Sequence, residues 1–184
     1  MHRLRFFGTL GATCILASSV YAVDAGTYDA YLESIDGDRI KLAQIQSHDD
    51  GRYSLTLDEE SFSDHFLSMR PFKCLEGPNK HWCHVPYPYK INRRVSSNDF
   101  TDLEYDFLFV WKGATEYGIN MWNGVYYRLT ETDGTLVGQI HEMDMGLLAV
   151  PPDEGELRPI SEYDLEESDP ESHWLPRLVI EQAN

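Results

Sequence analysis

Two cysteines, two histidines and three aromatic side chains crowd into residues 73–89, KCLEGPNKHWCHVPYPY. Side chains of these types support three kinds of chemistry: a disulfide, a zinc site, or a nucleophilic thiol with a histidine base. The spacing of Cys74, His81, Cys83 and His84 is C-x6-H-x-C-H, which matches none of the usual structural zinc patterns. A lone Cys-His proximity is an unspecific sign of catalysis, and the sequence therefore favours the disulfide.

The N-terminus indicates the compartment in which these cysteines work. Arg3 and Arg5 precede a short apolar run that ends at the small residue Ala22, a layout typical of a secretory signal peptide. We expect residues 1–22 to be removed, leaving one domain over residues 23–184 with no integral membrane segment. The predicted location is the periplasm or the extracellular space.

Export settles the pairing of the cysteines. The third cysteine, Cys14, lies inside the predicted signal peptide, so Cys74 and Cys83 remain as an even pair. Such a pair is oxidised by default outside the cytosol. Gly77, Pro78 and Asn79 can turn the chain back between them, and the sequence thus predicts a disulfide that staples this stretch.

An aromatic strip follows the second cysteine. Pro86 and Pro88 should keep residues 84–89 extended and stiff, and a stiff strip loses little entropy when it binds a partner. We therefore expect this loop to hold a small molecule or a protein partner in the periplasm or extracellular space. The candidate ligand-binding residues are Trp82, His84, Tyr87 and Tyr89. The alternative is that these rings pack into the core.

A second candidate site lies near residue 143. On a strand, His141, Met143 and Met145 would project from one face, and imidazole with thioethers is a ligand set that selects Cu(I). A metal-handling protein for copper or zinc is thus an alternative function, with His81 or His84 as possible further ligands. Core packing is the ordinary explanation for the methionines, and no resident cofactor is expected in the main hypothesis.

The composition excludes some functions and leaves others open. Without Arg3 and Arg5 the chain keeps 13 of its 15 basic residues against 31 acidic ones, a formal charge of −18. Such a surface repels nucleic acid and anionic membranes. The chain contains no G-x-S-x-G, H-E-x-x-H, G-x-G-x-x-G or phosphate-loop pattern. A hydrolase using paired carboxylates, such as Asp102 with Glu104 or Glu142 with Asp144, is a further alternative, but so many acidic residues make adjacency unspecific.

Turns and alternation predict the elements that must position these residues. Asp-Gly turns near 36, 50 and 133 are hairpin signals, and polar-apolar alternation favours half-buried strands. A helix is expected over 59–69 with Asp58 as its N-cap, a helical turn followed by a strand over 101–113, and a solvated or wrapping acidic, proline-rich loop over 151–170. The predicted strands are 28–35, 39–46, 52–57, 124–130, 135–145 and 177–181. The expected fold is a mostly β, single-domain antiparallel barrel or sandwich built from hairpins, with one short helix.

Overall fold

The computed structural model describes residues 23–67 and 71–183, and the predicted signal peptide, residues 1–22, lies outside them. Within the described residues the chain forms eleven strands and one short α-helix, α1 (Thr101–Asp106). The strands are β1 (Gly26–Glu33), β2 (Arg39–Ser47), β3 (Tyr53–Leu57), β4 (Ser63–Phe66), β5 (Pro71–Glu76), β6 (Lys80–His84), β7 (Phe109–Gly113), β8 (Gly124–Thr132), β9 (Thr135–Met143), β10 (Glu166–Glu167) and β11 (Arg177–Gln182). Short 3-10 helices lie at η1 (Glu59–Ser61), η2 (Met121–Asn123), η3 (Met145–Ala149), η4 (Glu162–Asp164) and η5 (Pro170–Ser172).

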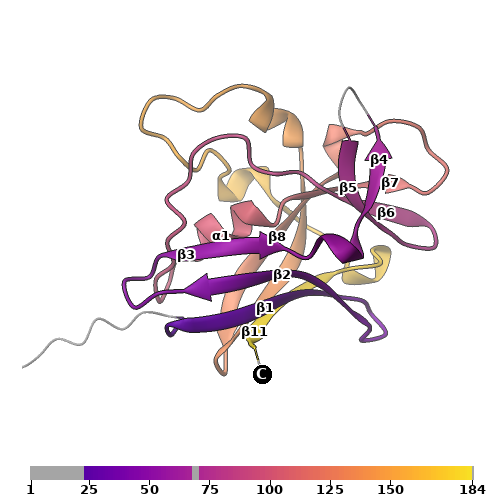
Figure 1. Cartoon of the computed structure of the whole chain (residues 1–184). Helices are drawn as coiled ribbons and strands as arrows, with labels where there is room; N and C mark the ends of the chain where they lie inside the picture. Colours follow the sequence, from indigo (N-terminus) through magenta and orange to yellow (C-terminus); the bar gives the residue numbers. More distant parts are fainter. Residues whose placement is uncertain (1–22, 68–70, 184) are drawn as a thin grey trace, which may run out of the picture.

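All of these strands join one antiparallel sheet. Its order is β3-β2-β1-β11-β9-β8-β7-β6-β5-β4, with β10 paired to β9 outside this path. The last strand, β11, lies between β1 and β9 and so ties the two halves of the chain together. In Figure 1, β1 to β3 cross the lower front of the molecule, while β4 to β6 stand at the upper right. The predicted mostly β fold with one short helix is confirmed, and the sheet stays open between β3 and β4.

The hairpins form where the sequence places turn residues. Asp133 and Gly134 join β8 to β9 with φ of 51° and 79°, the positive pair that a two-residue hairpin turn needs to match the strand twist. Gly37 and Gly51 likewise have positive φ at the turns after β1 and β2. The six predicted strands are all present, with bounds that differ by one to two residues.

The buried apolar side chains form two clusters, which pack against the sheet. The first includes Leu32, Leu42, Phe107, Phe109 and Tyr127, and the second includes Tyr105, Leu108, Val110, Tyr126 and Met145. Alternate residues of β7 belong to different clusters, as the period of two in a strand requires. The helix α1 packs beside β8. In Figure 1 the chain between β6 and α1 arches around α1.

The prediction of a helix over 59–69 is wrong for residues 59–67, and residues 68 and 69 lie outside the described residues. Asp58 does act as an N-cap, accepting a hydrogen bond from the N–H of Glu60, but it caps a 3-10 turn of only three residues, η1. Residues 63–66 then extend into β4, which pairs with β5. Serine, aspartate, histidine and phenylalanine are modest helix formers, so pairing with a neighbouring strand overrides the apolar spacing that suggested a helix.

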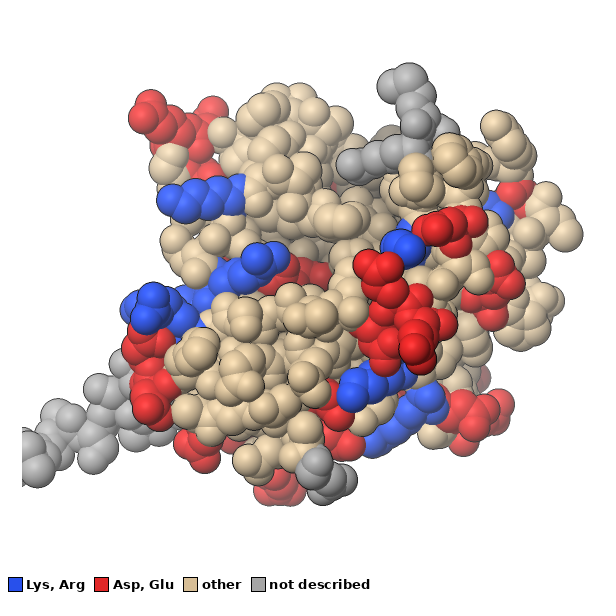
Figure 2. Space-filling model, in the orientation of Figure 1, with Lys and Arg blue, Asp and Glu red and all other residues tan. Residues whose placement is uncertain are grey.

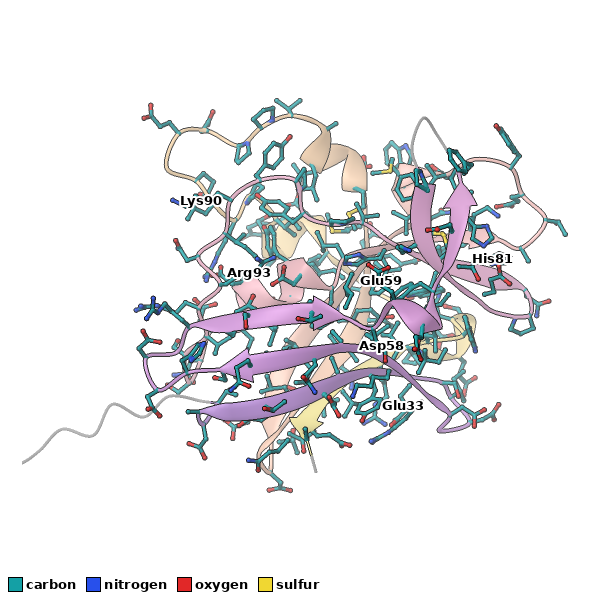
Figure 3. All side chains as sticks on the ribbon, viewed as in Figure 1. Glu33, Asp58, Glu59, His81, Lys90 and Arg93 are labelled. Carbon is teal, nitrogen blue, oxygen red and sulfur yellow. A yellow bond between two sulfur atoms is a disulfide. The ribbon has the colours of Figure 1, made fainter. Side chains whose placement is uncertain are left out.

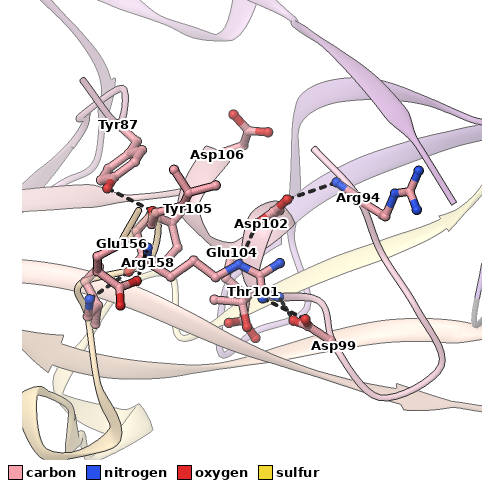
Figure 4. A network of polar contacts seen from close by, with 12 residues as sticks. Tyr87, Arg94, Asp99, Thr101, Asp102, Glu104, Tyr105, Asp106, Glu156 and Arg158 are labelled. Carbon is pink, nitrogen blue, oxygen red and sulfur yellow. Dashed lines mark hydrogen bonds and ion pairs between the residues drawn. The ribbon is translucent and has the colours of Figure 1, made fainter. Parts of the chain in front are cut away.

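The helical turn and strand expected over 101–113 are confirmed as α1 and β7. The acidic stretch over 151–170 is anchored near α1, because Arg158 pairs with Asp99 and Asp102 at 2.6 Å each. The N–H of Ile160 also donates to the Tyr105 hydroxyl at 2.7 Å. Figure 4 shows this set of contacts.

Among the described residues, none of the helices has the length and apolar character needed to cross a membrane.

Candidate functional site

The predicted disulfide is confirmed and lies inside a hairpin. Cys74 on β5 and Cys83 on β6 are register partners, and their sulfurs are bonded. Neither side chain is exposed to solvent. Because both sulfurs are consumed by the bond, neither is a thiolate for zinc or a nucleophile, and the zinc set of Cys74, His81, Cys83 and His84 does not form.

Strand β6 sends its side chains alternately to two faces of the sheet. His81 and Cys83 point to one face, while Trp82 and His84 point to the other. Trp82 is fully buried in the first apolar cluster, and its indole N–H donates to the Tyr127 hydroxyl at 3.0 Å. Its ring is therefore part of the core and offers no face to solvent.

The loop tyrosines are half-buried and hold the segment that follows β9. The hydroxyl of Tyr87 donates to the carbonyl oxygen of Leu157 at 3.1 Å, and that of Tyr89 donates to Leu148 at 3.0 Å. The Tyr87 ring also packs edge to face against the Tyr105 ring, with 4.7 Å between the ring centroids. The strip is thus fixed in place, with its hydroxyls used inside the protein and part of the Tyr87 ring left at the surface.

Tyr87 and His84 lie on one cavity, here called the β3 groove. Its volume is about 380 Å³, and it runs between β3 and the loop that follows β6. The side chains that line it include Leu55, Leu57, Glu59, His84, Pro86, Tyr87, Arg93 and Asp106. In Figure 2 the molecule is hollowed above β3, and in Figure 3 Arg93 and Glu59 mark opposite ends of this hollow. Apolar side chains thus form walls between an end lined by the Arg93–Asp106 ion pair and an end lined by Glu59.

His84 forms a buried polar point in the groove. Only 6% of the residue is exposed, and burial lowers the pKa of its imidazole, so the ring is neutral. Its Nε2 lies 3.0 Å from the carbonyl oxygen of Asp106 and must donate there. In a neutral imidazole the other nitrogen, Nδ1, then carries a lone pair and accepts a hydrogen bond. His84, which lines the groove, therefore has one ring nitrogen that can accept a hydrogen bond.

A compact polar set closes one end of the groove. Arg93 donates through Nε and Nη2 to the two carboxylate oxygens of Asp106, at 3.1 and 2.9 Å, and the Tyr53 hydroxyl donates to the same carboxylate at 2.8 Å. Arg93 is held at φ 51°, a backbone conformation that costs energy for a residue with a side chain and that gathers at ligand sites. Burial, followed by the charge of Asp106, raises the pKa of Tyr53, which stays a donor.

The three copper candidates do not form an exposed ligand set. Met143 and Met145 are buried in the second apolar cluster, where both approach Gly124. His141 on β9 has its Nδ1 3.1 Å from the carbonyl oxygen of Gln139. Copper binding at these residues stays a prediction, and the two methionines pack as core side chains.

Of the carboxylate pairs named from the sequence, Asp102 and Glu104 both make contacts within the fold. Asp102 is fully buried, pairs with Arg158 and accepts the N–H of Arg94 at 3.0 Å. Glu104 accepts the Tyr126 hydroxyl and, at 2.7 Å, the N–H of Leu129. Burial raises the pKa of Glu104, but its oxygens are both engaged by these donors. Figure 4 shows Asp102 between its partners Arg94 and Arg158.

Three residues that the sequence did not bring together converge on β4, β5 and β6. They are His65, Glu76 and His81, here called the His–Glu–His cluster, and their ligand atoms all lie within 4.8 Å of one another. The sequence did contain a signal, because the pairing of Cys74 with Cys83 makes Glu76 the cross-strand partner of His81. His65 was missed because residues 59–69 were expected to be helical.

No family model, curated protein or solved structure matches this chain. Its function must therefore be inferred from the chemistry of the groove and of the cluster.

Proposed function

We propose that the chain is an exported binding protein that holds a small, neutral, amphipathic organic molecule in the β3 groove. The observation that carries this proposal is that His84 and Tyr87, two residues singled out by the stapled sequence around Cys83, line one cavity. A volume of about 380 Å³ falls in the range of roughly 300–1,000 Å³ usual for small-molecule sites. The disulfide supports export, because such bonds persist in oxidising compartments.

The lining of the groove limits the ligand class. The Nδ1 atom of His84 requires a hydrogen-bond donor on the ligand, such as a hydroxyl or an amide N–H. Leu55, Leu57 and the Tyr87 ring favour a flat or apolar body. The charge of Arg93 is already balanced by Asp106, so a full charge on the ligand would find no free partner there and would lose its hydration.

The test uses neutral ring compounds that carry one donor group: phenol, benzyl alcohol and benzamide. Each is titrated into the oxidised mature protein while amide signals are followed by two-dimensional NMR. We expect dose-dependent shifts at Leu55, Leu57 and Tyr87. His84→Leu should weaken the best probe at least tenfold, because it removes the acceptor, and Tyr87→Ala should do the same because it removes a wall.

Two variants make this test specific. Tyr87→Phe keeps the ring and loses only the bond to Leu157, so it should bind as the wild type does. Tyr163→Ala removes a tyrosine that is 99% exposed elsewhere on the surface and should change nothing. Shifts confined to other parts of the molecule, or equal binding by wild type, His84→Leu and Tyr87→Ala, would disprove the groove as the site.

A further inference from the structure

The His–Glu–His cluster has the composition and spacing of a metal site. His65 Nε2 lies 2.9 Å from Glu76 Oε1, and the ring centroids of His65 and His81 are 5.0 Å apart. Ligand atoms around a tetrahedral zinc ion, with bonds of about 2.0–2.1 Å, lie about 3.3 Å from one another. Since the three ligand atoms are already within 4.8 Å, small side-chain rotations suffice to close on an ion.

His81 supplies the observation that a simple ion pair does not explain. Its Nδ1 is buried and has no hydrogen-bond partner within the described residues, although buried polar atoms are nearly always paired. The residue as a whole is only 9% exposed. His81 thus brings a buried, unpaired ring nitrogen to a cluster that also holds a carboxylate and a second imidazole, and a cation would satisfy such a group.

The framework around the cluster is covalently braced. The Cys74–Cys83 bond lies two residues from Glu76 along β5 and two residues from His81 along β6, on the same face of the hairpin. Strand β6 is also paired with β7 through the rung of His81 and Lys112. Figure 3 shows His81 next to this hairpin, with the yellow disulfide bond close by. Two of the three ligands are thus positioned before any ion arrives.

We propose that His65, Glu76 and His81 bind a divalent transition-metal ion of the zinc class, with at least one coordination position open to solvent. Two imidazoles and a carboxylate suit zinc, whereas calcium and magnesium prefer all-oxygen sites and Cu(I) prefers sulfur. Three protein ligands leave a fourth position for water. The side chain of Glu76 is 53% exposed, so this position faces solvent and the ion can exchange.

Lys112 allows the proposal to be tested in both directions. It is the register partner of His81 on β7, and its positive charge must repel a bound cation. Removing a ligand should therefore weaken metal binding, and removing the Lys112 charge should strengthen it.

The experiment is isothermal titration of the metal-free, oxidised mature protein with ZnCl₂ at pH 7.5. We expect one ion per chain with sub-micromolar affinity, unaffected by millimolar CaCl₂. Glu76→Gln should weaken the affinity at least tenfold and His65→Ala at least a hundredfold, while Lys112→Met should tighten it several-fold. His48→Ala removes an exposed histidine outside the cluster and should leave the affinity unchanged.

A cobalt spectrum adds a readout that a folding defect cannot imitate. Co(II) bound by two histidines and one carboxylate should give the intense visible bands of a tetrahedral site in the wild type and lose them in folded Glu76→Gln. Absence of binding tighter than about 100 μM, or equal affinity of wild type, Glu76→Gln and His65→Ala, overturns the proposal. The site is independent of the β3 groove, so His84→Leu and Tyr87→Ala should bind zinc normally.

Discussion

Two histidines on one strand show how differently the two faces of this sheet are used. His81 and His84 are three residues apart on β6 and point to opposite faces. Both are buried, and burial lowers the pKa of both. His84 donates to the carbonyl oxygen of Asp106 and lines a groove with apolar walls, whereas His81 clusters with a carboxylate and another imidazole.

The difference teaches that the neighbours across the strand, rather than the neighbours along the chain, decide what a residue can do. On the His84 side, β3 supplies two leucine side chains and the proline-rich loop supplies a tyrosine ring. These apolar groups suit an organic molecule. On the His81 side, β4 and β5 supply His65 and Glu76, which suit a cation. The disulfide should matter to both faces, because it fixes β6, the strand from which both histidines project.

The largest effect should follow from removing that shared feature. Cys74→Ala/Cys83→Ala opens a loop of about 10 residues, and the loop-entropy model predicts a loss of roughly 2.7 kcal/mol in the free energy of unfolding. Alanine is chosen because both sites are buried and apolar. Urea unfolding of the variant and of the wild type with and without reductant measures the loss.

The comparison becomes sharper if the two faces respond unequally. Zinc binding should suffer more than probe binding in the groove, since the bond braces Glu76 against His81 directly, whereas His84 is also held by the Asp106 carbonyl. Equal stability of the oxidised wild type and the double variant would show that the bond does not support the hairpin.

The next effect concerns pH and His84. The unfolded chain takes up a proton on this residue below about pH 6.5, but the folded protein does so only at lower pH, because burial depresses the folded pKa. Unfolding therefore binds a proton in this window, and the free energy of unfolding must fall as the pH drops below about 6.5, by at most about 1.4 kcal/mol per pH unit for one proton.

His84→Gln should make this dependence shallower between pH 7.5 and 5.5, as measured by urea unfolding, while His81 and His173, whose pKa values burial also lowers, keep a residual slope. The charged or titratable groups near His84 include Asp106, which favours its protonated form and opposes the burial effect. His48→Gln, at an exposed position, is the control and should retain the wild-type slope. A slope in His84→Gln as steep as in the wild type would mean that other groups cause the acid sensitivity.

Much of the fold could be predicted because its signals are local. Asp133-Gly134 required a hairpin, and alternation in residues such as Tyr53, Leu55 and Leu57 required strands. The same local reading went wrong at 59–69, where the spacing of Phe62 and Phe66 resembled one helix face. Strand β4 forms through pairing with β5, and pairing partners are not visible in the segment itself.

The candidate sites were predictable only in part for the same reason. His84 and Tyr87 could be chosen because they lie beside a recognisable staple, but the opposite wall of their groove, Leu55 and Leu57, comes from a strand about thirty residues earlier in the chain. The partner of His81 could have been found, since the Cys74–Cys83 pairing places Glu76 across from it. His65 could not, because its place depended on the misassigned element.

The smallest expected effect is the most informative about the His81 face. In the absence of metal, Glu76→Gln removes only a partly exposed ion pair with His65, and such pairs contribute little to stability. The urea midpoint should match the wild type within error at pH 7.5. Added ZnCl₂ should then raise the thermal midpoint of the wild type by mass action and leave that of the variant nearly unchanged. A marked loss of stability in the metal-free variant would make Glu76 a structural residue like Asp102, and the two faces of β6 would no longer differ in kind.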